Sequence, residues 1–453
     1  MQANALKPRV QSNTRLAKLR QSISEFVPLE VAGSLVLLAA TIFALLWANS
    51  PWADIYEKLW HTDIGISIGA FHLDQSLLHW INDGLMALFF FVVGLEIKRE
   101  LLVGELSSLR KALLPMMGAL GGMIAPALIY VALNARGSHA NGWGIPMATD
   151  IAFAVGVLAL LGSRIPSSLK IFLTALAIVD DIGAILVIAL FYTSQIFWGW
   201  LGLAALLLVV LVGFNLARIQ APLPYALVGL VIWFAVLASG IHATVAGVLI
   251  ALTIPAQAQL APLAFVEWGR KLLDTIEALE VPGAHVLESD DQQLVGRALQ
   301  RSAQEIQAPL QRLNYALHPL TTFVIIPLFA LANAGVTLPP ENVFVLLWQP
   351  VTLGVALGLV VGKQVGITLF AWLAVKLGWA DLPKGVAWRQ LYGVSWLGGI
   401  GFTMSLFISG LAFSDPEPLA QAKLAILIAS LVAGVVGFLF IYLTNAPGKA
   451  ANP

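Results

Sequence analysis

Apolar segments long enough to cross a membrane recur along almost the whole chain, and they restrict its fold more than any other feature. A helix needs roughly 20 mainly apolar residues to span the ~30 Å hydrocarbon core, and about twelve segments qualify. We therefore predict an all-α polytopic membrane protein with about 12 transmembrane helices. The candidate spans are residues 31–49, 76–97, 112–133, 143–162, 171–193, 195–214, 225–239, 241–255, 319–335, 347–377, 391–413 and 422–443.

The composition agrees with a membrane protein and excludes several other classes. Of the 453 residues, 59% are hydrophobic and 11% are charged, whereas a soluble domain carries about 25% charged residues. Lys plus Arg and Asp plus Glu both total 25, so the chain has no basic excess for nucleic acid. The absence of cysteine excludes disulfides, thiolate metal sites and thiol nucleophiles. Because HExxH, GxSxG and phosphate-loop motifs are also absent, we expect neither an enzyme nor a bound cofactor.

The distribution of basic residues predicts the orientation of the spans, because cytoplasmic loops carry an excess of Lys and Arg. With the N-terminus inside, every basic residue falls on the inner side except Lys58, Arg136 and Lys423 on the outer side and Lys363 within a span. We therefore expect a multi-pass protein of a bacterial-type inner (plasma) membrane with both termini cytoplasmic. Residues 1–30 lack the apolar core of a secretory signal, so the first span is expected to remain in the mature protein.

One long polar stretch separates the first eight predicted helices from the last four. Ser289-Asp290 can cap a helix, and apolar residues follow this pair at near-helical spacing, so an amphipathic helix is favoured over a folded domain. The predicted organisation is a cytoplasmic tail 1–30, transmembrane helices 1–8 in 31–255, a cytoplasmic loop with an amphipathic helix in 256–318, transmembrane helices 9–12 in 319–443, and a cytoplasmic tail 444–453.

The outer loop 51–75 contains a weak period of two. Ile64, Ile66 and Ile68 alternate with smaller or polar residues, and Phe71 and Leu73 do so after Gly69. This pattern predicts a small β-hairpin.

Two adjacent aspartates, Asp180 and Asp181, lie in the middle of the span 171–193. An ionisable side chain at the centre of a membrane costs about 2.5–3.5 kcal/mol, so it requires a reason. One alternative is that the pair marks a helix end in headgroup water, but apolar stretches continue on both sides. We predict a cavity where a cation finds hard oxygen ligands and where protons compete for the same oxygens.

Asp150 and Lys363 also stand out as ionisable residues within apolar spans. They could form a mutual structural ion pair, or they could compensate the ends of interrupted helices. We favour compensation, because Pro146 and small residues can break the span of Asp150, and glycines at 398–401 can break the eleventh span. Two interrupted spans in comparable positions predict an inverted-repeat transporter, with Asp150 facing helix N-termini and Lys363 facing C-termini.

Four further ionisable residues lie near the ends of spans, namely His242, Glu96, Glu100 and Asp83. His242 is either a helix cap or packing group, or a residue that responds to pH. Glu96 and Glu100 lie on one face of a helix. They either mark a solvated helix end or belong to a pH-responsive surface. Asp83 is predicted to form a hydrogen bond between helices.

Two other functions compete with cation–proton exchange. An intramembrane aspartyl protease needs two aspartates that face each other from different helices and share a proton, which neighbours on one helix do not easily do. A cation channel needs a continuous pore with a filter, and no filter sequence is recognisable. Transport that saturates and stays coupled to protons would reject the channel.

The sequence resembles the NhaA family of sodium/proton antiporters over nearly its whole length, apart from the tails and much of the 256–317 loop. The stretches that carry the resemblance are WINDGLMALFFFVVGLEIKREL, ATDIAFAVGVLALLGSRIPSSLKIFLTALAIVDDIGAILVIALFY, GIHATVAG, PLFALANAGV, GKQVGITLF and GGIGFTMSLFISGLAF.

The resemblance implies a role for individual residues. Asp180 and Asp181 would bind Na⁺ and protons, with Asp181 as the stronger cation ligand. Thr149 and Asp150 would lie where the interrupted helices cross, and Lys363 would balance their charge and pair with Asp180.

The resemblance also extends to a pH-responsive cytoplasmic surface that is only partly matched. Glu96, Glu100 and His318 fit that surface, whereas Asn314 and Tyr315 replace a Glu-His pair of the family pattern. The activation pH is therefore left open.

The resemblance implies a secondary, electrogenic and pH-regulated Na⁺(Li⁺)/H⁺ antiporter that exports sodium as protons enter. Its partners would be sodium or lithium ions, protons and membrane lipid. A homodimer through the outer loop is expected from the resemblance alone.

Overall fold

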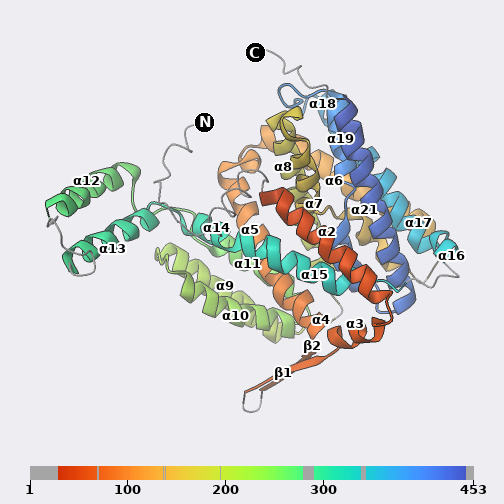
Figure 1. Cartoon of the computed structure of the whole chain (residues 1–453), viewed down its shortest axis with the longest axis horizontal. Helices are drawn as coiled ribbons and strands as arrows, with labels where there is room; N and C mark the ends of the chain where they lie inside the picture. The colour runs from red at the N-terminus through yellow and green to blue at the C-terminus, as the bar shows by residue number, and fades with distance from the viewer. Residues whose placement is uncertain are drawn as a thin grey trace.

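The structure is a computed structural model of the chain, and it describes residues 29–444 except 69–70, 136, 138, 194, 279–289 and 338–342. The described chain is a bundle of long apolar helices with one two-stranded hairpin (Figure 1). The predicted tails 1–30 and 444–453 lie almost wholly outside the described residues, as do Arg136 and the predicted capping residue Ser289.

The first eight predicted spans correspond to helical segments of the structure. They are α2 (Leu29–Ala48), α4 to α5 (Leu77–His79 and Met86–Val103, joined by the π-turn η2, Trp80–Leu85), α6 (Leu109–Asn134), η4 and α7 (Ala140–Met147 and Ile151–Leu160), α8 (Ser167–Phe191), α9 (Trp198–Leu216), α10 (Pro222–Ala238) and α11 (Ala243–Thr253). Short elements between them are α3 (Ala53–Trp60), η3 (Glu105–Ser107) and η5 (Gly162–Arg164).

The last four predicted spans also correspond to helical segments. They are α14 to α15 (Pro309–Leu320 and Ile326–Asn333, joined by the π-turn η7, Thr321–Ile325), α17 to α18 (Pro350–Leu357 and Lys363–Lys376, joined by the π-turn η8, Gly358–Gly362), α19 and α20 (Trp388–Leu397 and Phe402–Ala412), and α21 (Pro416–Thr444). A short helix, α16 (Val343–Leu347), precedes α17.

Not every apolar helix is long enough to cross a membrane by itself. Among the described residues, 9 helices are long and apolar enough, or 10 if the bent pair α19 and α20 is one span. Two shorter apolar helices, α10 and α11, fill the remaining predicted positions. The polytopic all-α architecture is confirmed, whereas the total of about 12 spans stays a prediction.

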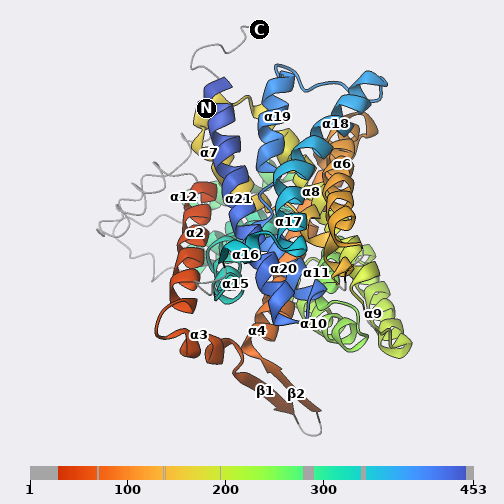
Figure 2. The ribbon, with the colours of Figure 1, turned by 90° about the vertical axis from the view of Figure 1, so that its right-hand side faces the viewer.

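The predicted hairpin is confirmed and marks one end of the molecule. Strand β1 (Asp63–Ile68) pairs antiparallel with β2 (Phe71–Ser76), with Asp63 opposite Ser76 and Ile68 opposite Phe71. Helix α2 runs toward the hairpin and α21 runs away from it (Figure 2). We use the hairpin side and the opposite side to name the two ends of the bundle.

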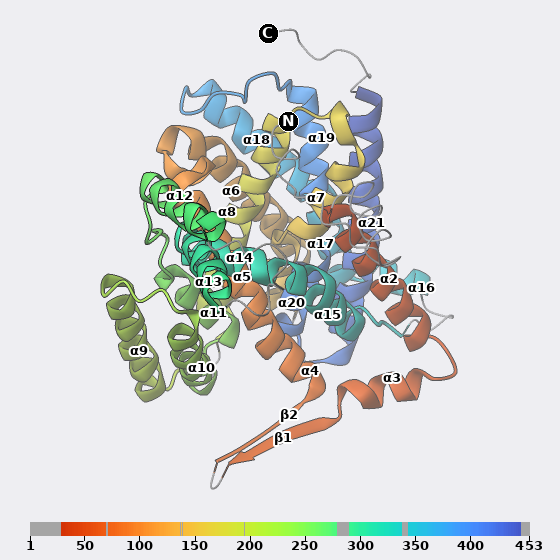
Figure 3. The ribbon, with the colours of Figure 1, turned by 60° about the vertical axis from the view of Figure 1, so that its left-hand side comes forward.

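The polar segment after α11 contains more helix than predicted. Helices α12 (Pro262–Ala278) and α13 (Asp290–Glu305) pack against each other and project from the bundle above α9 to α11 (Figure 3). Where one amphipathic helix was expected, two are present. The ninth span begins earlier than predicted, because α14 starts at Pro309.

The buried core surrounds the segments that carry the intramembrane charges. One large cluster joins α5, α6, α8 and α17 to α21, and a second, smaller cluster joins α9 to α11 to the adjacent face of α5. Residues of both interrupted spans belong to the large cluster, among them Ile145 and Ala154 of the fourth span and Leu397 and Phe402 of the eleventh.

Candidate functional site

Helix α8 carries the two predicted aspartates in its middle. Pro166 precedes its first turn and Tyr192 follows its last, and the helix is continuous between them, with apolar stretches on both sides of the aspartates. The exposed fractions of Asp180 and Asp181 are 1% and 2%. Both carboxylates are therefore inside the protein at the middle of a span, and the alternative of a hydrated helix end is contradicted.

The hairpin-side end of α8 is tied to the interrupted fourth span. The hydroxyl of Tyr192 donates to the carbonyl oxygen of Asn141 at 2.7 Å. Burial raises the pKa of Tyr192, so this group stays a neutral donor at ordinary pH. The aspartate helix and η4 are thus held in fixed register.

Lys363 is the direct partner of Asp180. It is the first residue of α18 after η8, and its side chain is fully buried. Its Nζ donates to Asp180 Oδ2 at 2.6 Å and to Thr149 Oγ1 at 3.0 Å. Lys363 therefore pairs with Asp180, as the resemblance implied, and the alternative ion pair with Asp150 is not formed.

The position of Lys363 depends on close packing between α18 and α6. A Cβ atom at Gly366 would lie 2.0 Å from the carbonyl oxygen of Gly121, a distance that no side chain permits. Glycine at both positions lets the two backbones touch, as small residues do in membrane helix pairs. This contact holds the first turn of α18 beside α8.

Asp150 lies where the two interrupted spans cross. It is the N-cap of α7, and its Oδ1 accepts from the Phe153 amide at 3.0 Å. Its Oδ2 accepts from the amide of Thr403 at 3.1 Å and from the hydroxyl of the same residue at 2.5 Å. One carboxylate thus caps the N-termini of both α7 and α20, whose helix dipoles favour a negative charge.

Carbonyl oxygens at the break between α19 and α20 accept hydrogen bonds from the segment that contains Asp150. The amide of Asp150 donates to the Ile400 carbonyl at 2.7 Å, and the hydroxyl of Thr149 donates to the Gly398 carbonyl at 2.8 Å. Since Thr149 also accepts from Lys363, the ammonium lies one hydroxyl away from the C-terminus of α19. The predicted compensation is present, with Thr149 as the link.

The oxygens around Asp180 and Asp181 are incompletely paired. Asp180 Oδ1 is sealed from solvent without a hydrogen-bond partner. Among the described residues, Asp181 has no hydrogen bond or ion pair, although three carboxylates and a lysine act on it electrostatically. Unpaired buried oxygens are costly unless a proton or cation joins them. Hard oxygen donors of this kind suit a small monovalent or divalent cation, or protons.

The carboxylates would not by themselves complete the coordination of a metal. Among the described residues, no group of three or more His, Cys, Asp or Glu side chains could hold a metal ion. Hydroxyl, carbonyl or water oxygens would have to complete the coordination of a cation at Asp180 and Asp181. Such a site fits a cargo that binds and leaves.

The predicted pH-responsive residues are divided between the two ends of the bundle. On the opposite side, His318 Nδ1 lies 3.9 Å from Glu96 Oε1. Glu100 pairs with Arg99 at 2.9 Å and accepts from the Glu105 amide at 3.1 Å.

Helix α14 contributes the two residues that differ from the family pattern on this side. Asn314 is buried with an unpaired Oδ1, and Tyr315 is exposed. They precede His318 by four and three residues, which is about one helical turn. Because both side chains are neutral, neither supplies a charge beside it.

His242 belongs to the hairpin side instead. Its Nδ1 lies 3.9 Å from Asp83 Oδ1, and the other oxygen of Asp83 pairs with His79 Nε2 at 2.8 Å. The predicted helix-to-helix hydrogen bond of Asp83 is made by its backbone carbonyl, which accepts from Trp233 at 3.0 Å. The structure therefore does not bring His242 together with Glu96, Glu100 and His318.

Thr403 is the residue of the crossing that sequence reasoning missed. It supplies both of the donors that reach Asp150 from α20. Its signal was present, because it lies only two residues after the glycine-rich break at 398–401. A polar residue at the second position of a helix that begins inside a membrane is a candidate for such a contact.

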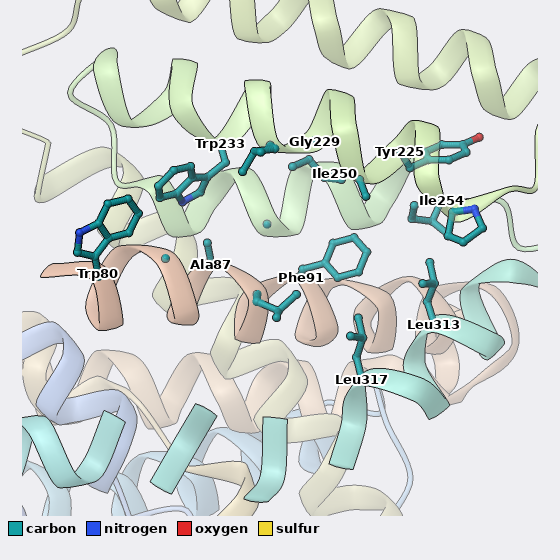
Figure 4. A pocket seen from close by; sticks show the side chains of 16 residues that line it. Trp80, Ala87, Phe91, Tyr225, Gly229, Trp233, Ile250, Ile254, Leu313 and Leu317 are labelled. Carbon is teal, nitrogen blue, oxygen red and sulfur yellow. The ribbon is translucent and has the colours of Figure 1, made fainter. Parts of the chain in front are cut away.

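A cavity of about 490 Å³ lies elsewhere, between α5, α10, α11 and α14. Apolar side chains line it, with Trp80 and Trp233 toward one end and Tyr225 and Leu313 toward the other (Figure 4). It contains no carboxylate. The candidate ion site is therefore separate from this cavity, and it is recognised by its unpaired oxygens.

Comparison with known proteins gives one consistent answer. Residues 24–441 match the model of the family described as Na⁺/H⁺ antiporter 1. The chain is 50% identical to the Na⁺/H⁺ antiporter NhaA of Oleidesulfovibrio alaskensis over 424 residues, covering 94% of each protein. It is 52% identical to that of Acidithiobacillus ferrooxidans over 424 residues, covering 92% of this chain and 96% of the relative. It is 47% identical to Na⁺/H⁺ antiporter NhaA 1 of Saccharophagus degradans, covering 97% and 95%.

Proposed function

The chain belongs to the Na⁺/H⁺ antiporter 1 family, and from that premise we propose that Asp180 and Asp181 form its site for Na⁺ or Li⁺ and for protons. The protein is a multi-pass membrane transporter that exchanges Na⁺ for H⁺. The observation that carries the site assignment is the set of unpaired carboxylate oxygens on α8, buried beside Lys363.

Exchange follows from competition for the same oxygens. With no cation bound, protons neutralise the carboxylates that no hydrogen bond satisfies. A sodium or lithium ion that binds Asp181 displaces its proton, because one carboxylate oxygen cannot hold both. Only the loaded forms reorient, since a reorienting empty site would carry uncompensated charge.

Lys363 supplies the second exchangeable charge. Its ammonium neutralises Asp180 while the cation is absent. A cation at the same carboxylate weakens this pair, and Lys363 retains Thr149 as its other partner at the crossing. If each bound monovalent cation releases one proton from Asp181 and one from Lys363, two protons are exchanged for one cation and net charge moves in every cycle. The exchange is then electrogenic, driven by the proton gradient without a bound cofactor.

The remaining features complete the proposal. The hairpin side faces outward and both termini lie in the cytoplasm of a bacterial-type inner membrane, as the basic residues indicate. Glu96, Glu100 and His318 then form a cytoplasmic surface whose protonation regulates activity, while His242 acts from the outer side through Asp83. A homodimer through the hairpin and contacts with lipid belong to the same proposal.

Transport by purified protein in liposomes tests this function. Wild-type protein is expected to collapse a preformed pH gradient when Na⁺ or Li⁺ is added, with a rate that saturates. Asp181→Asn should abolish the response, because the neutral amide offers one oxygen and no charge. Asp381→Asn is the matched control, since Asp381 is exposed and pairs only with Arg110 at 3.0 Å.

Two outcomes would overturn the assignment. Sodium-dependent proton flux that survives Asp181→Asn unchanged would remove the site from α8. Flux that rises without saturation and without protons would indicate a channel instead of an exchanger.

A further inference from the structure

Helix α20 begins inside the membrane core, so its first amide groups need acceptors from elsewhere. The first N–H groups of any helix lack intrahelical partners, and the hydrocarbon region offers no water to satisfy them. Asp150 accepts from the amide of Thr403, the second residue of α20. The amide of the first residue, Phe402, must therefore find a different acceptor.

That acceptor is Ser430, from the middle of α21. Its Oγ accepts from the Phe402 amide at 3.1 Å, and its exposed fraction is 6%. Two consecutive amides at the N-terminus of α20 thus have acceptors from different spans. Asp150 lies in the interrupted fourth span, and Ser430 lies in the last span.

The face of α21 around Ser430 is shaped for the interrupted span. Ala433 and Gly437, three and seven residues later, lie on the same face of the helix. A Cβ atom at Gly399 would lie 3.2 Å from the Ala433 Cβ, and one at Gly437 would lie 2.7 Å from Leu397. Small residues here allow the break between α19 and α20 to rest directly on α21, and Ser430 is the polar member of this face.

We propose that Ser430 is a positioning residue for ion exchange, which fixes the N-terminus of α20 at the distance from Asp150 that sets the affinity of the aspartates for Na⁺. This inference rests on the proposed exchange site on α8. Ser430 does not touch the cargo. It acts through Phe402 and Thr403 on Asp150, and through the crossing on Lys363 and Asp180.

Loss of the Ser430 hydroxyl is expected to move the N-terminus of α20 toward Asp150. Without Ser430 Oγ, the Phe402 amide is left without an acceptor and draws the helix end toward the carboxylate that already serves Thr403. The positive end of the α20 dipole then neutralises Asp150 more completely. The crossing becomes more positive, and a cation binds less tightly at the nearby aspartates.

Three variants test the proposal. Ser430→Ala removes the acceptor, Ser430→Thr keeps it, and Ser409→Ala is the matched control. Ser409 is a fully buried serine of α20 whose hydroxyl donates only to the Leu406 carbonyl of its own helix, at 2.8 Å. All three are purified and compared for the KM of Na⁺, the maximal rate and the activity–pH profile in liposomes.

Ser430→Ala is expected to raise the KM for Na⁺ by about 5-fold or more, because even the lower end of the cost of leaving one buried donor unsatisfied corresponds to that factor. The maximal rate should stay close to wild type, and the activity–pH profile should be displaced. Ser430→Thr should restore both. Ser409→Ala should lower thermal stability without a change in KM or pH profile. Equal KM values and pH profiles for Ser430→Ala and Ser409→Ala would overturn the proposal.

A second readout separates this proposal from the exchange site itself. Na⁺ that binds the folded protein raises its melting temperature, and at a fixed Na⁺ concentration the rise is larger when the affinity is higher, whether or not transport occurs. If wild-type protein transports normally and Ser430→Ala keeps the full Na⁺-dependent shift, the role of Ser430 is wrong and the exchange site stands. If Na⁺ shifts the melting temperature of neither wild type nor variant, the exchange site fails, and the role of Ser430 fails with it.

Discussion

Helices α8 and α21 occupy comparable positions, since each is the unbroken helix that follows an interrupted span. Their buried polar groups differ. Near its centre, α8 holds two carboxylates with unpaired oxygens, whereas α21 holds the hydroxyl of Ser430 and no charged residue after Lys423. With the proposed exchange site on α8, one half of the bundle would carry the exchange chemistry and the other half would supply the geometry of the crossing.

A charge placed on α21 is expected to have the largest effect, because α21 differs from α8 in burying no carboxylate near its centre. Ser430→Asp would bury a carboxylate beside Asp150 and without a cation, and a charge at this depth costs about 2.5–3.5 kcal/mol before repulsion is added. We expect loss of folded protein, measured as the yield of monodisperse protein from membranes. A stable, active Ser430→Asp variant would show that α21 tolerates the chemistry of α8.

Removing the positive partner of α8 should have the next largest effect. Lys363→Ala leaves Asp180 buried without its ammonium, and breaking a buried pair costs about 3–5 kcal/mol. Lys363→Ala combined with Asp180→Ala should recover part of the loss, because the uncompensated charge is gone. Thermal unfolding of the purified variants measures both. A double variant no more stable than the single one would mean that the ion pair is not what stabilises this region.

Thr403→Val tests the crossing between the two halves. It removes the hydroxyl donor to Asp150 and leaves the backbone donor in place. A hydrogen bond to a charged group contributes about 1.5–3 kcal/mol, so a rise in the KM for Na⁺ of about tenfold or more is expected. Thr444→Val, at an exposed hydroxyl on the last turn of α21, is the control. An unchanged KM would separate the crossing from the ion site.

Tyr56 gives the smallest expected effect, because it lies outside both halves of the comparison. Its hydroxyl, on α3, donates to the Leu331 carbonyl at 2.8 Å. Tyr56→Phe should lower stability by about 1 kcal/mol without changing transport. A larger loss, or altered transport, would extend the functional region to the hairpin side.

The same tyrosine predicts a stability change at high pH. Burial raises the pKa of Tyr56 to about 12. The folded state therefore keeps its proton when the unfolded state, with a tyrosine pKa of about 10, has lost it. Stability should fall as the pH rises from about 10 to 12, and Tyr56→Phe should lessen that fall. Thermal unfolding across this range measures it, and an identical slope in the variant would contradict the assignment.

Hydropathy and charge predicted the main features of the fold and site. Apolar length placed the spans, and the cost of burying Asp180, Asp181, Asp150 and Lys363 singled out the residues that the structure gathers around the crossing. Those inferences succeeded because lipid penalises a charge on any span, whatever it packs against.

Sequence reasoning failed where the outcome depends on contacts between helices. Thr403 and Ser430 are common residue types in spans, and only the path of the break shows that each meets an orphaned helix end. His242 was grouped with Glu96 because both can titrate, yet they lie at opposite ends of the bundle. The second amphipathic helix was missed because periodicity alone did not divide the polar segment.

The proposed mechanism requires that cations and protons compete for the same oxygens on α8. Proton release from purified protein on addition of Na⁺, followed with an indicator dye in weak buffer, tests it most directly. We predict that wild-type protein releases protons saturably with Na⁺ or Li⁺ and that Asp180→Asn combined with Asp181→Asn releases none. Unchanged proton release from that double variant, or sodium binding to wild-type protein without any proton release, would contradict the account.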